Sequence, residues 1–390
     1  MTFRKLPTGV QDILPRECRI LGEVRERLSR AFEARGYEPV ISAAVDYYDT
    51  YSKITNALPQ ERMFKFTDQD GKLLVLRPDA TLSISRIAAT KLPDPNVRLS
   101  YFLNKWDAQN TGGVKSREII QAGVERFGEE GAFSDAQTIA FAVDCMREVG
   151  LENCIVEVGH VGYMKGILTG CGLSDARAEE VRAYINAKDG LNAERVLRAA
   201  GANEEALSAV RALPTLFGGA EVFGRAETLT GNAQAREAIA YLKKVHRILT
   251  DMGYEQDVCF DLGTGKSLSY YSGIVFSGLV QEVGAPVLSG GRYDGLADDF
   301  GKHIPAVGFA IGLKRVLVAL ERQGRLPGSE VPDAAVACEE GAEGQADALA
   351  KSMIAEGKRV TLAAAYGETA LDRIAAKQKY LVTKTGVRQL

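Results

Sequence analysis

The stretches that decide the fold are Gly290-Gly291-Arg292-Tyr293-Asp294 and Ala306-Val307-Gly308-Phe309-Ala310-Ile311-Gly312-Leu313-Lys314-Arg315. The first predicts a strand that ends in a glycine turn. The second predicts a buried apolar strand whose glycines allow close approach of backbone or ligand, before a helix starts near Leu313. Arg315 then lies at a helix start, where its guanidinium and the helix N-terminus both favour an anion such as phosphate. A core strand followed by a surface arginine explains the same residues equally well. The rest of the sequence is therefore needed to distinguish an anion-binding site from this simpler arrangement.

The length and composition are those of a folded protein with two or three domains. The chain has 390 residues, of which 46% are hydrophobic and 25% are charged. A net charge of -3 argues against a protein whose main role is to bind the nucleic acid backbone. The N-terminal residues lack an apolar signal segment, and no stretch approaches the ~18 apolar residues that a membrane-spanning helix needs. We therefore expect a cytoplasmic protein that contacts neither nucleic acid nor membrane.

Cysteine and histidine usage argues against metal sites and histidine-based catalysis. The six cysteines are widely scattered and form no C-x-x-C pair, which favours reduced, mostly buried thiols over a zinc cluster or a disulfide framework. Only three histidines are present, and none has H-E-x-x-H spacing, so a Ser-His-Asp triad is not expected either. We predict no metal and no cofactor.

The segment from Gly263 to Ser267 contains the Gly-Lys-Ser end of a P-loop, but its spacing excludes that motif. A P-loop would need a glycine at position 260, where the chain has Phe260, and the segment leads into a strand rather than a helix.

The order of the predicted elements indicates an α+β fold. Apolar spacing predicts a helix over residues 18–35 that ends at Gly36, and a capping box starting at Ser134 predicts a helix that stops at Gly150. Strands are expected at 64–66, 73–76, 154–158, 258–260, 270–280 and 287–288, and a helix at 313–322. Most of these strands are linked by hairpins, so the sheet should be antiparallel.

Two further segments differ from this core. Between about 164 and 253 helical periods recur and strand signals vanish, which predicts a helical insertion. The 59 residues from Pro332 to Leu390 predict a short α/β unit, with strands at 334–337 and 359–362, helices at 346–356 and 369–379, and a possible strand at 380–383. Such a unit is near the lower size limit for an independent core, so we expect it to be loosely appended.

Several other stretches carry recognisable motifs in a fixed order. Leu76-Arg77-Pro78-Asp79-Ala80-Thr81 predicts a strand end and a helix start, with Pro78 at the first helical position. The others are the Leu6–Pro15, Arg117–Gly128 and Leu268–Phe276 stretches.

Together with the opening pair, these stretches resemble the catalytic core of the histidyl-tRNA synthetases over roughly residues 1 to 325. The resemblance implies the class II aminoacyl-tRNA synthetase-like fold: an antiparallel sheet of six to seven strands with flanking helices, and self-association through the class II dimer interface. It also implies that residues 332–390 are truncated relative to an anticodon-binding domain.

The resemblance also implies a histidine pocket. Asp79 and Thr81 match positions that face the substrate histidine, where the synthetase has glutamate in place of Asp79. Gln121, Glu125 and Tyr271, with neighbouring Tyr270, match further pocket positions. Carboxylates here would accept hydrogen bonds from a substrate ammonium, and the amide and phenol would supply neutral ones. The alternative to a binding pocket is an ordinary polar strand face with aromatic residues at its rim.

Three departures from the synthetase pattern affect its chemistry. Trp106-Asp107 replaces the phenylalanine-arginine pair of the second motif, and a carboxylate beside phosphate costs roughly 4 kcal/mol at 4 Å and an effective dielectric of 20. Lys266 replaces the histidine-specific arginine and loses its bidentate fork. The following loop positions, Gln109, Asn110 and Lys115, also depart from the pattern. Arg315, which matches the ATP-phosphate arginine of the third motif, is therefore expected to belong with Asp107 to a vestigial nucleotide site.

A synthetase core with a damaged adenylation centre and a short tail resembles the regulatory subunits of ATP phosphoribosyltransferase. This family implies a non-catalytic partner of the short-form catalytic subunit, required for the first step of histidine biosynthesis and able to convey feedback by histidine. The alternatives are a histidyl-tRNA synthetase with an atypical second motif, or a pseudo-synthetase that senses tRNA.

Overall fold

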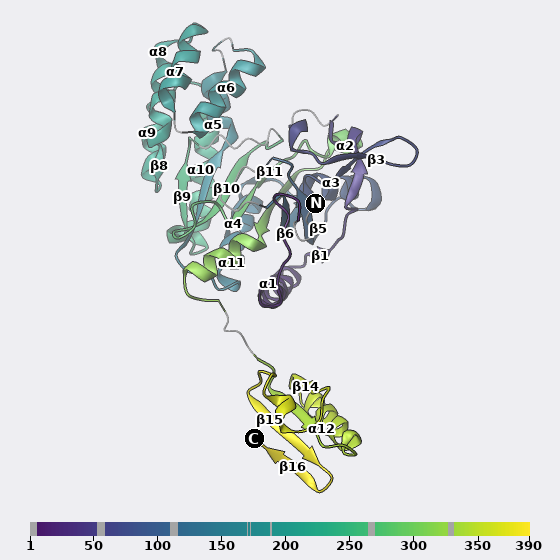
Figure 1. Cartoon of the computed structure of the whole chain (residues 1–390). Coiled ribbons are helices and arrows are strands. Elements are labelled where there is room, and N and C mark those ends of the chain that lie inside the picture. Colours follow the sequence, from purple (N-terminus) through teal and green to yellow (C-terminus); the bar gives the residue numbers. More distant parts are fainter. Residues whose placement is uncertain are drawn as a thin grey trace. The chain divides into compact units, whose positions relative to one another are not determined.

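The computed structural model describes residues 6–52, 59–109, 116–169, 171, 173–187, 189–263, 270–326 and 331–390. The chain divides into two compact units, Met1–Leu326 and Pro327–Leu390. Figure 1 shows the elements of each unit, and we describe the units separately.

A nine-stranded sheet forms the centre of the first unit. In spatial order its strands are β1 (Glu38–Pro39), β5 (Arg98–Trp106), β6 (Glu118–Phe127), β12 (Ala306–Gly312), β11 (Leu288–Arg292), β10 (Ile274–Val280), β7 (Cys154–His160), β9 (Val258–Asp261) and β8 (Phe217–Gly218). The six strands from β5 to β7 are antiparallel, whereas β1 pairs with β5 and β9 with β7 in parallel. The α+β class is confirmed, and the sheet is wider than predicted and mixed at its ends.

Helices cover one face of this sheet. They are α1 (Pro15–Ala34), α4 (Gly131–Glu148) and α11 (Leu313–Arg322), which contact one another and strands β6, β7 and β12. Helix α1 buries the apolar stripe Ile20, Val24, Leu28 and Phe32, as its spacing predicts. It ends before Gly36, whose positive φ of 74° suits the turn after a helix.

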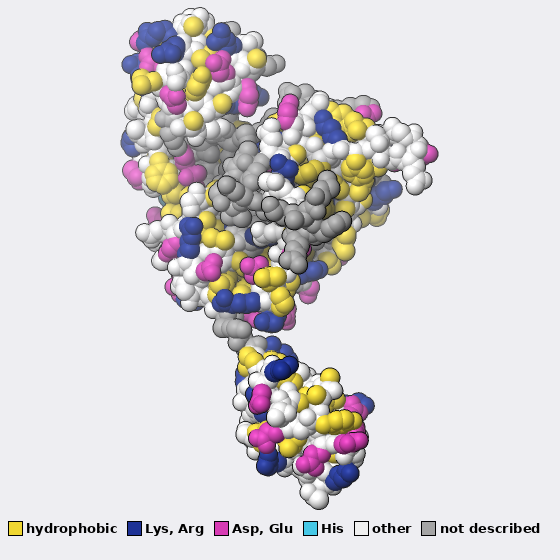
Figure 2. Space-filling model, viewed as in Figure 1, with side chains coloured by type: hydrophobic (Ala, Val, Ile, Leu, Met, Phe, Trp, Pro, Cys, Tyr) yellow, Lys and Arg dark blue, Asp and Glu magenta, His cyan; other side chains and the backbone are white. Residues whose placement is uncertain are grey.

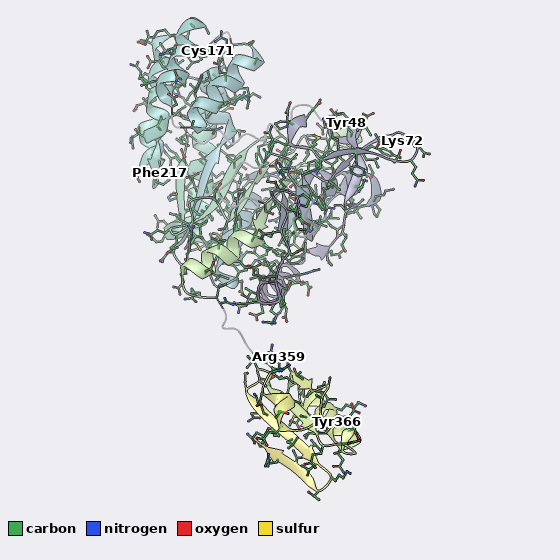
Figure 3. The ribbon with its side chains drawn as sticks, in the orientation of Figure 1. Tyr48, Lys72, Cys171, Phe217, Arg359 and Tyr366 are labelled. Carbon is green, nitrogen blue, oxygen red and sulfur yellow. The ribbon has the colours of Figure 1, made fainter. Side chains whose placement is uncertain are left out.

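The opposite face carries a second, smaller core. Helix α3 (Ala80–Lys91) packs on β5 and β6, and α2 (Tyr48–Ser52) lies against a small antiparallel sheet. That sheet has the order β2 (Val45–Tyr47), β4 (Leu73–Leu76), β3 (Lys65–Thr67), so the predicted β3–β4 hairpin is confirmed. Lys72 lies in its connecting turn (Figure 3). Two short 3-10 helices, η1 (Gln60–Arg62) and η4 (Asp298–Phe300), complete this side.

The segment predicted as a helical insertion contains six helices: α5 (Val161–Leu168), α6 (Asp175–Asn186), α7 (Gly190–Ala199), α8 (Glu204–Ala212), α9 (Glu221–Glu227) and α10 (Ala233–Asp251). Short 3-10 helices lie before β8 and before β9: η2 (Leu213–Thr215) and η3 (Glu255–Asp257). The prediction that this segment contains no strand is wrong at Phe217, because β8 adds to the edge of the sheet beside β9 (Figure 3). Helix α10 packs on both α5 and α4 and so attaches the segment to the core.

The second unit is a four-stranded sheet of order β14 (Val360–Leu362), β13 (Ala334–Cys338), β15 (Gln378–Thr383), β16 (Gly386–Gln389), with helix α12 (Glu343–Ala355). The predicted helix over 369–379 is wrong. A 3-10 turn, η5 (Glu368–Leu371), buries Leu371 under the sheet, and the chain then enters β15. Ladder bonds from β15 to both β13 and β16 override the helical propensity of this alanine-containing stretch.

Three local predictions at element ends are also wrong. Helix α4 begins at Gly131 with Glu130 as its N-cap residue, so Ser134 lies within the helix and caps nothing. Pro78 lies outside α3, because Asp79 is the N-cap residue and its Oδ1 accepts the Leu82 N–H at 2.9 Å. Gly290 lies inside strand β11 rather than in a turn, paired with Phe276 and Phe309.

Candidate functional site

A cavity of ≈ 230 Å³ opens on the face of the central sheet that carries α3. Eight of the nine residues predicted from the sequence line it: Asp79, Thr81, Asp107, Gln121, Glu125, Tyr270, Tyr271 and Arg315. They come from the start of α3, from the residue after β5, from β6 and α11, and from the segment before β10. The ninth, Lys266, lies outside the described residues, as do Asn110 and Lys115.

Three glycines of the deciding stretches, Gly290, Gly308 and Gly312, line this cavity. A side chain at Gly308 would place its Cβ within 3.0 Å of both Glu125 Oε2 and the carbonyl oxygen of Val124. At Gly291 a Cβ would lie 2.6 Å from the ring of Tyr271. Because Gly308 and Gly291 are paired neighbours on β12 and β11, their bare backbones leave room for these two side chains.

Glu125 is the most deeply buried acid in the cavity wall, with 1% of its surface exposed. Its Oε1 accepts hydrogen bonds from Thr81 Oγ1 at 2.8 Å and Tyr101 Oη at 3.2 Å, and its Oε2 accepts one from the Tyr293 hydroxyl. Burial raises the pKa of Glu125 to about 8, although the three hydroxyl donors oppose the shift. This carboxyl therefore exchanges a proton near neutral pH, and a bound cation would favour its ionised form.

Asp79 and the tyrosines surround Glu125. The N-cap role of Asp79 fixes its carboxylate by one oxygen, and the side chain is 6% exposed. The Tyr270 and Tyr271 rings lie 4.9 Å apart, and Tyr270 also meets Tyr293 edge-on at 6.1 Å. This end of the cavity thus combines two carboxyls with aromatic walls, which is suited to a cationic or hydrogen-bond-donating group in a flat ligand.

Asp107 is not the isolated negative charge that the sequence predicts. Arg62, from η1, forms a two-pronged ion pair with it, in which Nε lies 3.0 Å from Oδ2 and 3.2 Å from Oδ1. The backbone N–H of Gln109 also donates to Oδ1 at 3.0 Å. Since Arg62 neutralises the carboxylate, the repulsion expected between Asp107 and a phosphate is largely removed. What remains is the loss of a free arginine at this position.

The cavity is also lined by cations. Arg315 donates from Nη1 to the carbonyl oxygen of Pro286 at 2.5 Å, and burial lowers its pKa. Lys105, on β5, also lines the cavity, and burial lowers its pKa as well. Lys314 lies beside them and donates to Ser116 Oγ at 3.4 Å.

The sequence reasoning missed four residues of this site: Arg62, Tyr101, Lys105 and Tyr293. Tyr101 and Lys105 have the period-2 spacing that places side chains on one face of a strand, so β5 carried a usable signal. Tyr293 stands within the deciding stretch itself. Arg62 gave no signal, because its pairing with Asp107 joins positions 45 residues apart.

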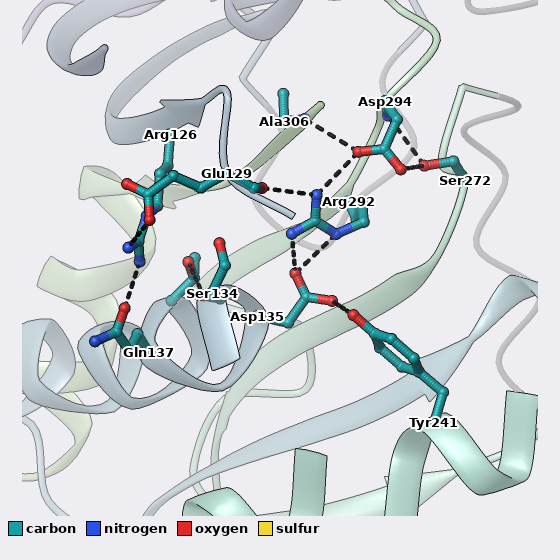
Figure 4. Close-up of polar contacts among 11 residues, drawn as sticks. Arg126, Glu129, Ser134, Asp135, Gln137, Tyr241, Ser272, Arg292, Asp294 and Ala306 are labelled. Atoms are coloured by element: carbon teal, nitrogen blue, oxygen red, sulfur yellow. Dashed lines mark hydrogen bonds and ion pairs between the residues drawn. The ribbon is translucent and has the colours of Figure 1, made fainter. Parts of the chain in front are cut away.

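Figure 4 shows a charge cluster around Arg292 and Asp135, which are both buried. Arg292 donates from Nε and Nη2 to Asp135 Oδ1 at 2.9 and 2.5 Å, and from Nη1 to Asp294 Oδ1 at 2.9 Å. Tyr241, on α10, donates to the other oxygen of Asp135 at 2.7 Å, and Ser272 donates to Asp294 at 2.9 Å. The cluster therefore joins β11, α4, α10 and the segment that carries Tyr271.

Within the described ranges, no group of three or more His, Cys, Asp or Glu side chains is arranged to hold a metal ion. None of the helices in that part of the chain is both long and apolar enough to cross a membrane.

The chain is similar to known proteins over most of its length. The family model described as histidyl-tRNA synthetase matches residues 9–316. The ATP phosphoribosyltransferase regulatory subunit of Acetivibrio thermocellus is 42% identical over 81% of this chain and 76% of its own length. That of Desulforamulus reducens is 34% identical over 93% of this chain and 90% of its own length.

Solved structures give the same result. A Bacillus halodurans protein, described as an ATP phosphoribosyltransferase regulatory subunit/histidyl-tRNA synthetase, superposes with a TM-score of 0.84 at 28% identity, covering 93% of each chain. A Nostoc histidyl-tRNA synthetase, at 18% identity and a TM-score of 0.80, shares the fold over 99% of this chain and 92% of its own. These matches show that the chain belongs to the histidyl-tRNA synthetase-like family of ATP phosphoribosyltransferase regulatory subunits.

Proposed function

We propose that this chain is a non-catalytic regulatory subunit of ATP phosphoribosyltransferase and acts in the cytoplasm in the first step of histidine biosynthesis. It would act by forming a hetero-oligomer with the short-form catalytic subunit, which lacks a regulatory domain of its own. The names of the relatives from Acetivibrio and Desulforamulus support this assignment.

The observation that carries the proposal is the Arg62–Asp107 ion pair. The resemblance puts an arginine of the second synthetase motif at position 107, where it would bind the ATP phosphate and the carboxylate being activated. Here Asp107 occupies that position and uses Arg62 as its own partner. Stabilisation of developing charge by a fixed cation accounts for several kcal/mol in such reactions, so its loss supports the absence of aminoacylation.

The cavity is proposed to remain in use as a histidine pocket. Asp79, Thr81, Glu125 and Tyr271 converge there, and Gln121 lines the same wall. Histidine bound in this cavity would shift the balance between active and inactive arrangements of the complex. Coupling of this kind between two sites is typically worth about 1–3 kcal/mol.

Self-association through the class II dimer interface is part of the proposal. The segment after α1 and the small sheet expose large apolar side chains: Ile41 is 82% exposed, Tyr47 51% and Phe66 40%. Figure 2 shows hydrophobic atoms gathered on the side of the molecule where α2 and β3 lie. Exposed apolar groups of this kind support contact with a second copy.

The test is reconstitution with the short-form catalytic subunit. Condensation of ATP with phosphoribosyl pyrophosphate should be fast only when both chains are present, and histidine should slow it. Histidine-dependent pyrophosphate exchange by this chain alone should stay at background. Exchange above background would favour a working histidyl-tRNA synthetase, and tight binding of uncharged tRNA would favour a tRNA-sensing module. Either result, without stimulation of the catalytic subunit, overturns the proposal.

A further inference from the structure

Lys105 is a cation in the cavity without a partner among the residues that the structure describes. It follows Tyr101 and Leu103 on the cavity face of β5, and Lys105 itself lines the cavity. Its ammonium makes no hydrogen bond or ion pair with any residue that the structure describes, in contrast to Arg62, which is paired with Asp107. Asp79 and Asp107 act on it only through space, and neither comes within ion-pair distance.

Arg315 is in a similar state. Its Nη1 donates to a neutral carbonyl group, that of Pro286, and no acidic side chain among the described residues lies within 4.0 Å of its guanidinium. Nε and Nη2 make no hydrogen bond to a residue that the structure describes, and Arg315 lines the cavity. Burial lowers the pKa of Lys105, and the positive charge of Arg315 makes a smaller contribution in the same direction.

Two partly buried cations that repel each other are unfavourable unless an anion joins them. Burial of a charge costs free energy that only a paired, hydrogen-bonded counter-charge recovers. The other cations of the cavity have interaction partners. Arg62 forms an ion pair with Asp107, and Lys314 donates a hydrogen bond to Ser116 and is attracted by the charge of Glu118. Lys105 and Arg315 therefore line one cavity, and neither has an acidic partner within ion-pair distance among the described residues.

We propose that Lys105 and Arg315 form an oxyanion subsite in this cavity, which anchors the carboxylate or phosphate group of a ligand whose donor groups meet Asp79 and Glu125. The proposal rests on the proposed ligand-binding role of the same cavity. It differs from a vestigial nucleotide site because the cation lost at position 107 is replaced from position 105, two residues earlier on the same strand.

Two kinds of ligand present such an oxyanion. An amino acid offers a carboxylate next to its ammonium, so one ligand would meet both the acids and the cations of the cavity. A phosphorylated compound, such as a nucleotide or pyrophosphate, would bind the cations. Lys105 and Arg315 can only donate hydrogen bonds. A ligand whose anionic group has been removed therefore offers these two side chains no acceptor.

Calorimetric titration of the full-length protein distinguishes these sources. Three ligands are used: L-histidine, pyrophosphate, and histamine, which is histidine without the carboxylate. Each is titrated into the wild-type protein and into the Lys105→Gln, Lys105→Arg and Arg315→Gln variants. Lys302→Gln, an exposed lysine outside the cavity, is the matched control. Thermal unfolding of each variant establishes that it is folded.

If the anion is a carboxylate, Lys105→Gln weakens L-histidine about 10- to 100-fold, the range expected for one charged hydrogen bond, and leaves histamine unchanged. Lys105→Arg keeps most of the affinity because it keeps the charge. If the anion is phosphate, pyrophosphate binding is lost instead and histidine is unaffected. In either case Arg315→Gln should weaken the same ligand as Lys105→Gln does, and Lys302→Gln should leave both affinities unchanged.

Affinities for both anionic ligands within about threefold of wild type in the Lys105→Gln and Arg315→Gln proteins would overturn the subsite, as would no binding of either ligand to wild type alone or in complex. Stimulation of the catalytic subunit is measured in parallel with the same proteins. If the wild-type protein binds an oxyanion through Lys105 but does not stimulate the catalytic subunit, the proposed function is wrong and the proposed subsite is still supported.

Discussion

Substitution of Gly308 by alanine tests whether the bare backbone of β12 is what makes the cavity. The new Cβ would come within 3.0 Å of Glu125 Oε2 and of the Val124 carbonyl oxygen. The carboxylate could turn away, but the carbonyl belongs to the central sheet and cannot. Overpacking of this kind costs about 1–3 kcal/mol. Loss of one hydroxyl hydrogen bond to Glu125, which is mostly protonated at neutral pH, adds about 0.5–1.5 kcal/mol. We therefore expect the free energy of unfolding to fall by ~1.5–4.5 kcal/mol.

The assay is urea unfolding followed by tryptophan fluorescence. Trp106 is the only tryptophan and lies on β5, so the signal reports the first unit alone. Gly312→Ala is the matched control: it is on the same strand, its φ is -81°, and the nearest atom to its new Cβ is 3.5 Å away. Alanine there should be neutral or stabilising by up to ~1 kcal/mol. If the two variants unfold within about 0.5 kcal/mol of each other, the reasoning about the cavity lining is wrong.

Three further outcomes follow from buried charges. Asp135→Asn should cost ~3–5 kcal/mol in urea unfolding, because it leaves Arg292 buried without its main partner, whereas Glu26→Gln, in an exposed pair, should cost under ~0.5 kcal/mol. Burial lowers the pKa of His160 to about 4, so its neutral form is favoured on folding. Stability should therefore fall by ~3 kcal/mol as pH drops from 6.5 to 4, and His160→Asn, which keeps a helix cap, should remove that pH dependence. The raised pKa of Glu125 acts oppositely: its contribution is present below pH 4.5 and lost as pH rises through about 8. The difference in unfolding free energy between wild type and Glu125→Gln should shrink over that range, and a constant difference would contradict the burial of Glu125.

Sequence reasoning succeeded where local pattern and family resemblance agreed. The β12–α11 boundary, with strand Ala306–Gly312 followed by a helix from Leu313, was predicted from apolar spacing and glycine positions. The cavity residues Asp79, Glu125 and Tyr271 were identified by resemblance, and the structure brings them together. Their proposed role in binding histidine stays a prediction.

The failures have a common physical origin, since they depend on contacts between distant parts of the chain. Gly290-Gly291 suggests a turn when only neighbours are considered, but the side chains that need this space come from Tyr271 and Phe276 on other segments. The partner of Asp107 is 45 positions away and belongs to a 3-10 turn with no motif of its own. The helix predicted over 369–379 does not form, because the end of this stretch pairs as a strand with β13, whose residues lie about 40 positions earlier.

Arg292 has a consequence for anyone who engineers this protein. It stands between Gly291, which admits the Tyr271 ring, and Tyr293, whose hydroxyl reaches Glu125. The carboxylate that it shares with Tyr241 also seats α10 on the core. Arg292 thus links a strand beside the cavity to the helix that attaches the helical segment, so a substitution there would disturb both regions at once.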